Sequence, residues 1–128
     1  MTENIVQTKS YKFSLRIVGL ARMLDQKKEY VFSRQILKSG TSIGANIEES
    51  IGGQSEKDFF FKLCIAYKEA RETHYWLRLL KDSKTLEEKI ANSLLTDCEE
   101  LIKIIGKIQS TLRKKLKIIE DCRLKIED

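Results

Sequence analysis

Apolar residues recur every three or four positions along most of the chain, which is the spacing of one face of an α-helix. The clearest stripe lies before residue 52 and consists of Ile36, Gly40, Ile43, Ile47 and Ile51. Gly52-Gly53 then interrupts the pattern, and Ser55 with Asp58 three residues later resembles a helix N-cap. Residues 33–80 therefore predict two long helices joined by a tight turn. Gly40 and Gly44 lie four residues apart near the stripe, where they would let a neighbouring helix approach closely.

The same periodicity predicts four helices, at about 9–27, 32–52, 56–82 and 86–120, in a single domain covering 1–128. The expected core stripe of the first is Phe13, Ile17, Leu20, Ala21 and Leu24, and that of the third is Phe59, Leu63, Ala66, Ala70 and Leu77. Thr85 and Glu88 have the spacing of a capping box for the fourth. The predicted fold is all-α, an antiparallel up-and-down four-helix bundle that assembles into a homo-oligomer.

The fourth helix carries a sustained heptad pattern. Its two series are Cys98, Ile105, Leu112, Ile119 and Ile126, and Leu94, Leu101, Ile108, Lys115 and Cys122. A helix that continues to Ile119 would be about 50 Å long at 1.5 Å per residue, much longer than the first helix. We therefore expect its end to extend past the rest of the bundle, and Lys115 to mark the point where the core opens.

Two segments, SGTSIGANIEE at 39–49 and EARETHYWLRLL at 69–80, resemble the four-helix-bundle family of the 23S rRNA intervening-sequence proteins. The matching residues are Ser42, Ile43, Asn46, Ile47, Glu49, Glu69, Ala70, Glu72, Tyr75, Trp76 and Leu77. Members are encoded inside insertions of the bacterial large-subunit rRNA gene, and the accessory variability determinant of diversity-generating retroelements is related to them. One departure from the family pattern is Ser50, where a Gly or Ala is expected.

The resemblance implies a ring-shaped homopentamer with no catalytic activity and a link to RNA and retroelements. Ser42, Ile43, Asn46, Glu49 and Glu72 are the motif residues, and we expect them to fix helix register rather than bind a ligand. A hairpin centred near Gly53 would place Glu49 beside Lys57 or Asp58. Asn46 lies at the edge of the apolar stripe, so its amide should have a hydrogen-bonding partner.

Charge is unevenly distributed over the 128 residues, of which 34% are charged and none is proline. The formal net charge is +5, and residues 103–128 carry +4 of it. A basic segment of this kind favours polyanions such as RNA or DNA. The candidate phosphate-binding residues are Lys103, Lys107, Arg113, Lys114 and Lys117. Arg113, Lys114, Lys115 and Lys117 are spread around the helix and no aromatics alternate with them, which predicts diffuse, sequence-independent attraction.

Two helices carry more apolar residues than one bundle requires. The surplus lies on the third helix at Phe61, Ile65, Trp76 and Leu79, and on the first at Tyr11, Leu15 and Val18. Large exposed apolar patches are rare on monomeric proteins. We therefore expect these residues to form an interface between copies of the chain.

Residues typical of catalysis or metal binding are missing. A bundle di-metal site needs two Glu-x-x-His pairs, but His74 is the only histidine and Arg71 stands three residues before it. There is no Cys-x-x-Cys pair, no phosphate-binding loop and no recognisable triad. Cys64, Cys98 and Cys122 are widely spaced and are expected to be reduced, buried thiols. No catalytic residue, metal, cofactor or small-molecule substrate is predicted.

The sequence has no apolar run long enough for a membrane helix and no signal segment, which predicts a cytoplasmic protein without membrane contact. The favoured function is a non-enzymatic oligomer associated with nucleic acid. The alternative is a protein–protein scaffold whose lysines only solvate long helices, and composition alone does not separate the two.

Overall fold

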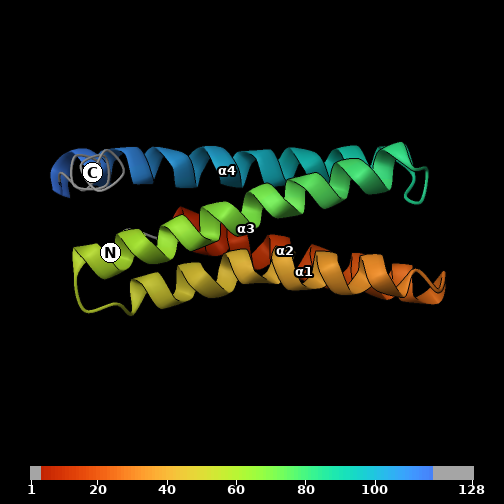
Figure 1. Ribbon diagram of the computed structural model, residues 1–128, viewed down its shortest axis with the longest axis horizontal. Coiled ribbons are helices and arrows are strands. Elements are labelled where there is room, and N and C mark those ends of the chain that lie inside the picture. The colour runs from red at the N-terminus through yellow and green to blue at the C-terminus, as the bar shows by residue number, and fades with distance from the viewer. Residues whose placement is uncertain (1–3, 117–128) are drawn as a thin grey trace, which may run out of the picture.

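The structure is a computed structural model that describes residues 4–116, and these residues form four α-helices (Figure 1). Their bounds are Ile5–Gln26 for α1, Tyr30–Ile51 for α2, Glu56–Asp82 for α3 and Glu88–Leu116 for α4. No strand occurs in this part of the chain, so the predicted all-α class is confirmed. The heptad positions Ile119, Cys122 and Ile126 lie outside the described residues.

Each helix packs on the next one along the chain, and the chain doubles back at every loop (Figure 1). Gln7, near the start of α1, donates hydrogen bonds to the carboxylate of Glu48, near the end of α2. Lys115, near the end of α4, pairs with Glu56 at the start of α3 at 2.6 Å. This arrangement is that of a helical bundle.

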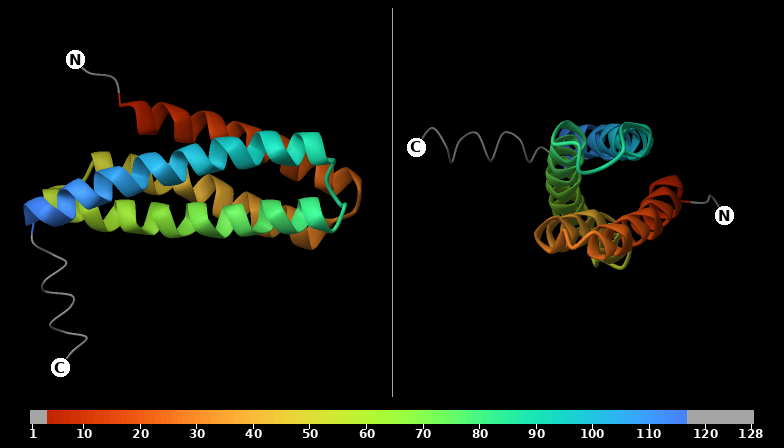
Figure 2. Two further views of the ribbon diagram at one scale, coloured as in Figure 1. Left: turned by 90° about the horizontal axis from the view of Figure 1, so that it is seen from above. Right: turned by 90° about the vertical axis from the view of Figure 1, so that its right-hand side faces the viewer.

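The helices follow an open arc when the bundle is seen end-on, with α1 and α4 at its two ends (Figure 2). Two ion pairs connect these ends, Lys9 with Glu100 at 3.1 Å and Arg16 with Asp97 at 2.6 Å. α4 continues beyond the N-terminal end of α1, as Figure 2 shows, but its end still lies beside α3 through the Lys115 pair. Lys115 is therefore an exposed ion-pair residue rather than a gap in the core.

The core runs the length of the bundle and is built from one stripe of each helix. Its largest fully buried hydrophobic side chains are Ile17, Leu24, Ile36, Ile43, Ile47, Leu63, Leu77, Leu80, Leu101, Ile105 and Cys98. The prediction for the start of α3 was wrong, because Phe60 is buried and Phe59 only half-buried. Phe60, Leu63 and Ala66 follow one another at intervals of three, which keeps them on the core side, whereas Phe59 points about 100° away from Phe60.

α1 and α2 approach most closely at two glycines of α2. A Cβ added at Gly40 would lie 2.8 Å from both Cγ atoms of Ile17, and one added at Gly44 would lie 3.1 Å from the Ser14 hydroxyl. These distances are shorter than ordinary van der Waals contacts. The glycines therefore allow the close approach that their spacing predicted.

The helix ends differ in how they are capped. α1 begins at Ile5, earlier than expected, because the side chain of Asn4 accepts a hydrogen bond from the Gln7 amide. Ser55 caps α3 as predicted, accepting from the Asp58 amide at 3.1 Å. The capping box predicted at Thr85 is wrong. The Thr85 hydroxyl contacts that of Ser83 at 2.8 Å, and α4 begins only at Glu88.

The register between α2 and α3 also differs from the expected one. Glu49 pairs with Lys62 at 2.7 Å, not with Lys57 or Asp58. A helix presents a side chain to its neighbour only once per turn, so an error in the assumed turn geometry moves a pair by three or four residues. No helix in the described part of the chain is long and apolar enough to span a membrane.

Candidate nucleic-acid interface

Three lysines form an exposed stripe along the outer side of α4. Lys103, Lys107 and Lys114 are all exposed, and none of their ammonium groups has an ion pair within residues 4–116. At about 100° per residue they lie within roughly 40° of one another around the helix. They span about 16 Å along its axis at 1.5 Å per residue.

The neighbouring basic residues have other contacts. The Arg113 guanidinium lies over the Phe60 ring, 5.6 Å from its centroid, and Arg113 is half-buried. Lys115 is held by Glu56. Lys117 lies outside the described residues. Of the basic residues that were expected to be spread around α4, Arg113 and Lys115 therefore have partners within the protein. In the described part, only Lys114 of this group belongs to the exposed stripe.

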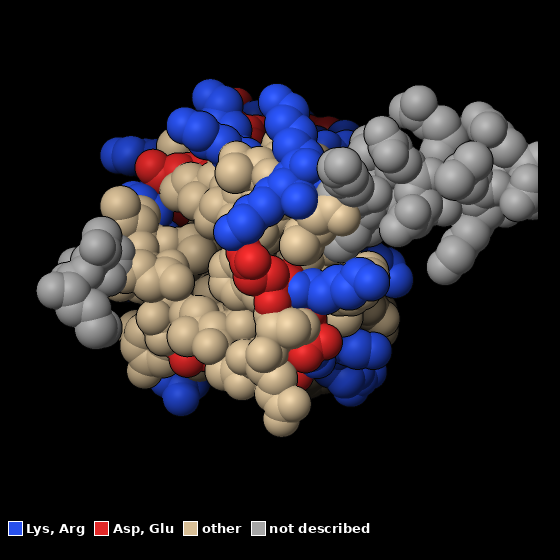
Figure 3. Space-filling model, turned by 90° about the vertical axis from the view of Figure 1, so that its left-hand side faces the viewer, with Lys and Arg blue, Asp and Glu red and all other residues tan. Residues whose placement is uncertain are grey.

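Figure 3 shows the end of the molecule at which α4 finishes and α3 begins. Lys and Arg side chains gather along the upper edge of this view, where α4 lies, and acidic side chains appear below them. Other Lys and Arg side chains lie at the right and lower right of this view, so the basic residues at this end are not confined to the upper edge.

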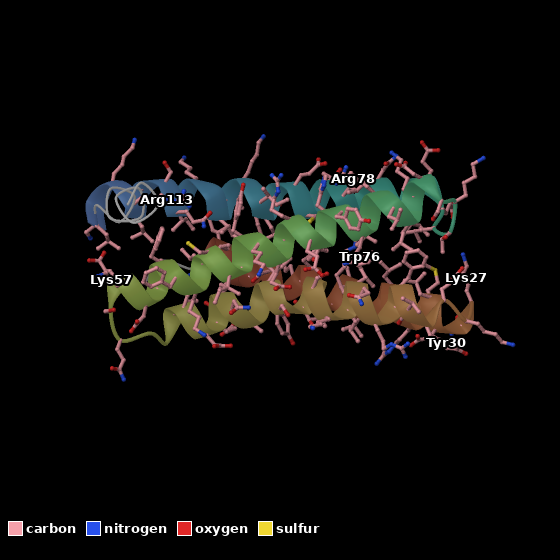
Figure 4. The ribbon with its side chains drawn as sticks, viewed as in Figure 1. Lys27, Tyr30, Lys57, Trp76, Arg78 and Arg113 are labelled. Atoms are coloured by element: carbon pink, nitrogen blue, oxygen red, sulfur yellow. The ribbon has the colours of Figure 1, made fainter. Side chains whose placement is uncertain are left out.

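A surface hollow of about 760 Å³ lies between α3 and α4, next to the stripe. Its lining residues are Arg71, His74 and Arg78 of α3 and Glu99, Glu100, Ile102 and Lys103 of α4. Lys103 therefore belongs both to the stripe and to the hollow. In Figure 4, Arg78 lies on the side of α3 that faces α4.

Both acids of the hollow have partners. Glu99 is 2.9 Å from Nε2 of His74, and Glu100 pairs with Lys9 of α1. Arg71 and Arg78 have no ion pair within the described part of the chain. The sequence analysis considered His74 as a metal ligand, which it rejected, and named neither of the two arginines as a binding residue. Their spacing of three and four residues on either side of His74 was the signal that could have placed all three on one side of α3.

The predicted interface residues of α3 divide into two groups. Phe61 and Ile65 are 49% and 42% exposed, and Tyr75 is exposed on the same side of the helix. Trp76 and Leu79 are instead half-buried. Trp76 packs edge-on against Phe32 of α2 with ring centroids 6.3 Å apart, between α3 and the helix below it in Figure 4. Trp76 therefore stabilises the packing of α3 on α2 within one protomer.

On α1, Tyr11 and Leu15 are 61% and 57% exposed, and Val18 is half-buried. Tyr11 borders a groove of small side chains between α1 and α2. Four of the seven residues that sequence analysis assigned to an interface are therefore exposed on the protomer: Tyr11, Leu15, Phe61 and Ile65. Ile5 of α1 and Tyr75 of α3 are exposed as well and were not assigned.

The motif residues make contacts within and between helices. Ile43 is fully buried. The Ser42 hydroxyl donates to the Lys38 carbonyl at 2.6 Å, and the Asn46 amide donates to the Ser42 carbonyl at 2.8 Å. The predicted partner for Asn46 is thus confirmed, and it is the backbone one turn earlier. The hydroxyl of Ser50, the departure from the family pattern, is buried and donates to the Ile47 carbonyl at 2.6 Å.

Glu72 and Glu69 lie one turn apart on α3. Glu72 accepts a hydrogen bond from the Trp76 indole at 3.2 Å. Burial raises the pKa of Glu69, and the nearby Glu72 carboxylate raises it further.

Cys98 is buried against the Ala70 carbonyl, and burial raises the pKa of its thiol to about 12. Cys64 is half-buried beside Gln109, and Cys122 lies outside the described residues. A thiol that stays protonated at neutral pH is a poor nucleophile. Within residues 4–116, no three His, Cys, Asp or Glu side chains come together as metal ligands would.

The sequence pattern of the 23S rRNA-intervening sequence proteins matches residues 2–107, which is most of the chain. The chain belongs to the 23S rRNA-intervening sequence protein family. The crystal structure of a protein of unknown function from the S23 ribosomal protein family of Bacteroides thetaiotaomicron is similar to this family member. The two are 45% identical with a TM-score of 0.79, and the match covers 82% of this chain and 98% of the other. No curated protein sequence matches the chain.

Proposed function

We propose that this 23S rRNA-intervening sequence family member is a non-enzymatic, antiparallel four-helix bundle that forms a homo-oligomer and associates with nucleic acid through phosphates. The observation that carries the proposal is the exposed stripe of Lys103, Lys107 and Lys114 on α4, whose charges have no acidic partner in the described part of the chain. Lysines held in a row attract a phosphate backbone without reading its bases. The family's name, which refers to an intervening sequence of 23S rRNA, favours RNA as the partner.

Oligomerisation strengthens this association because each copy of the chain adds a stripe. Several weak phosphate contacts on one assembly bind a strand more tightly than one contact alone. The exposed apolar residues Phe61 and Ile65 of α3 and Tyr11 and Leu15 of α1 support such an assembly. The resemblance to the family favours a pentamer.

The salt dependence of RNA binding tests the proposal. A fluorescent single-stranded RNA and a DNA duplex are titrated with the protein over a range of salt concentrations. Binding should weaken with salt for both. Changing Lys103, Lys107 and Lys114 together to Gln should reduce the log–log slope by about 2 for the RNA and about 3 for the duplex, since each lost phosphate contact contributes about 0.7 and about 0.9 respectively.

A matched control variant loses three positive charges, as the stripe variant does, but keeps the lysines of the stripe. Arg22, Lys28 and Arg34 are exposed, have no ion pair within residues 4–116 and lie on α1, the following loop and α2. Changing these three to Gln should leave the slope nearly unchanged. Equal slopes for the stripe variant and this control would refute the proposal.

The second candidate function is a protein–protein scaffold, which the exposed apolar side of α3 favours. Ile65→Glu should dissociate the assembly in light scattering and leave the helical content intact, because the side chain is exposed in the protomer. Val31→Glu, at an exposed position at the start of α2, is the control. A wild-type protein that is monomeric at micromolar concentration would contradict the oligomer.

A further inference from the structure

The hollow between α3 and α4 collects more positive charge than its acids neutralise. Arg71, Arg78 and Lys103 line it, and Lys9 approaches it through Glu100. The three lining cations and the carboxylates of Glu99 and Glu100 leave a net charge of +1, to which Lys9 adds from beside Glu100. The lining also includes the half-buried Ile102, which gives the hollow an apolar part.

The three lining cations come from two helices and converge on one space. Arg71 and Arg78 are two turns apart on α3, about 10 Å at 1.5 Å per residue, with His74 between them. Lys103 faces them from α4. Arginines contact phosphate oxygens through two parallel N–H groups, so a pair of them with a lysine opposite suits a phosphate group.

The hollow also lies where the lysine stripe ends. A phosphate backbone that follows the stripe from Lys114 through Lys107 reaches Lys103 at the rim of the hollow. Past Lys103 the strand enters the hollow, where Glu99 and Glu100 are held by His74 and Lys9. A strand that follows the stripe in this direction therefore ends with its last phosphate near Arg71 and Arg78.

We infer that the hollow formed by Arg71, Arg78 and Lys103 binds the terminal phosphate of a nucleic-acid strand whose backbone lies along the α4 stripe. A terminal phosphate monoester carries close to two negative charges, whereas an internal phosphodiester carries one. The terminal group consequently gains more from the positively charged hollow than any internal phosphate does. This inference rests on the proposed nucleic-acid association and adds which part of the strand is recognised.

The test compares three versions of one short single-stranded RNA, with a phosphate at its 5′ end, at its 3′ end or at neither. Their affinities for the full-length protein are measured by fluorescence anisotropy at a fixed salt concentration. The wild type should bind one phosphorylated strand roughly tenfold more tightly than the unphosphorylated strand, which is the effect of one charge-assisted hydrogen bond. Arg71→Gln/Arg78→Gln should abolish this preference and still bind the unphosphorylated strand.

Arg22→Gln/Arg34→Gln removes the same charge on α1 and α2 and should keep the preference. Both pairs of residues are exposed, so both variants should fold, which circular dichroism checks. Equal affinity of the wild type for all three RNAs would overturn the inference and leave the proposed function standing. A preference that survives in the Arg71→Gln/Arg78→Gln variant would overturn it as well. No binding of any strand would overturn the proposed function and the inference with it.

Discussion

The contact between Gly40 and Ile17 makes the Gly40→Ala substitution an informative test of the α1–α2 packing. The new Cβ would lie 2.8 Å from two carbon atoms of Ile17, which is completely buried and branched at Cβ. Ordinary carbon contacts are about 3.5–4.0 Å, so Ile17 must leave its rotamer or α1 must move away. Overpacking of this kind costs about 1–3 kcal/mol.

The substitution also has a favourable effect, because Ala stabilises a helix by about 1 kcal/mol relative to Gly. The net expectation for Gly40→Ala is a loss of about 0–2 kcal/mol in the free energy of unfolding. Gly19→Ala on α1 is the matched control, since nothing lies within 4 Å of its added Cβ. That variant should gain about 1 kcal/mol.

Urea unfolding followed by circular dichroism at one protomer concentration measures both variants. The expected difference between them is about 1–3 kcal/mol, the cost of the contact alone. Ile17→Ala removes the two clashing carbons, so the double variant Gly40→Ala/Ile17→Ala should be more stable than the two single effects predict. If Gly40→Ala stabilises the protein as much as Gly19→Ala does, the close approach of the helices is wrong.

Four further experiments, on Asn46, Cys98, Glu69 and Lys28, test other features of the structure. Asn46→Asp should lower the free energy of unfolding by about 1–3 kcal/mol, because a carboxylate cannot donate to the Ser42 carbonyl. Asn46→Leu should lower it less, and chemical denaturation measures both variants. Cys98 should resist iodoacetamide at pH 8 in the native protein and react once urea unfolds it, as mass spectrometry of the peptide would show. Glu69→Gln should stabilise the fold at pH 7, because the raised pKa of Glu69 makes the ionised carboxylate unfavourable in the folded protein. The gain should disappear below the ordinary pKa of glutamate, where the carboxyl group is protonated in both the folded and the unfolded protein, and urea titrations at several pH values measure it. Lys28→Gly should raise the free energy of unfolding by about 1 kcal/mol, because Lys28 has a positive φ of 63°, and an unchanged melting temperature would contradict that strain.

The sequence was sufficient to predict features that depend on residues close to one another along the chain. The helical stripes, the Gly52-Gly53 break and the Ser55 cap all follow from local spacing, and the structure contains them, except that Ile51 is 43% exposed and Phe59 is replaced in the core by Phe60. The Thr85 cap was predicted wrongly, because the spacing between Thr85 and Glu88 does not show whether Thr85 hydrogen-bonds to another residue. Its hydroxyl contacts Ser83, and its carbonyl accepts from Lys27 of the α1–α2 loop.

The candidate surfaces depended on pairing between helices, which the sequence does not specify. Whether a lysine of α4 is available for a ligand is decided by its neighbour: Lys115 meets Glu56, whereas Lys114, the preceding residue, has no ion pair in the described part. Trp76 likewise has an apolar neighbour, Phe32, only because α2 lies beside it. Helical angles alone therefore indicated the type of surface and misjudged which residues compose it.

The apolar side of α3 and the hollow are separated around the helix, so one copy of the chain can use both. At about 100° per residue, Ile65 and Tyr75 lie within roughly 40° of Phe61, whereas Arg71 and Arg78 lie about 80–100° from it. A second copy that covers Phe61 and Ile65 would leave the arginines facing α4 and solvent. Assembly and phosphate binding should then be separable by substitution: Ile65→Glu should lower RNA affinity by removing multivalency yet retain the preference for a terminal phosphate, which the Arg71→Gln/Arg78→Gln variant loses.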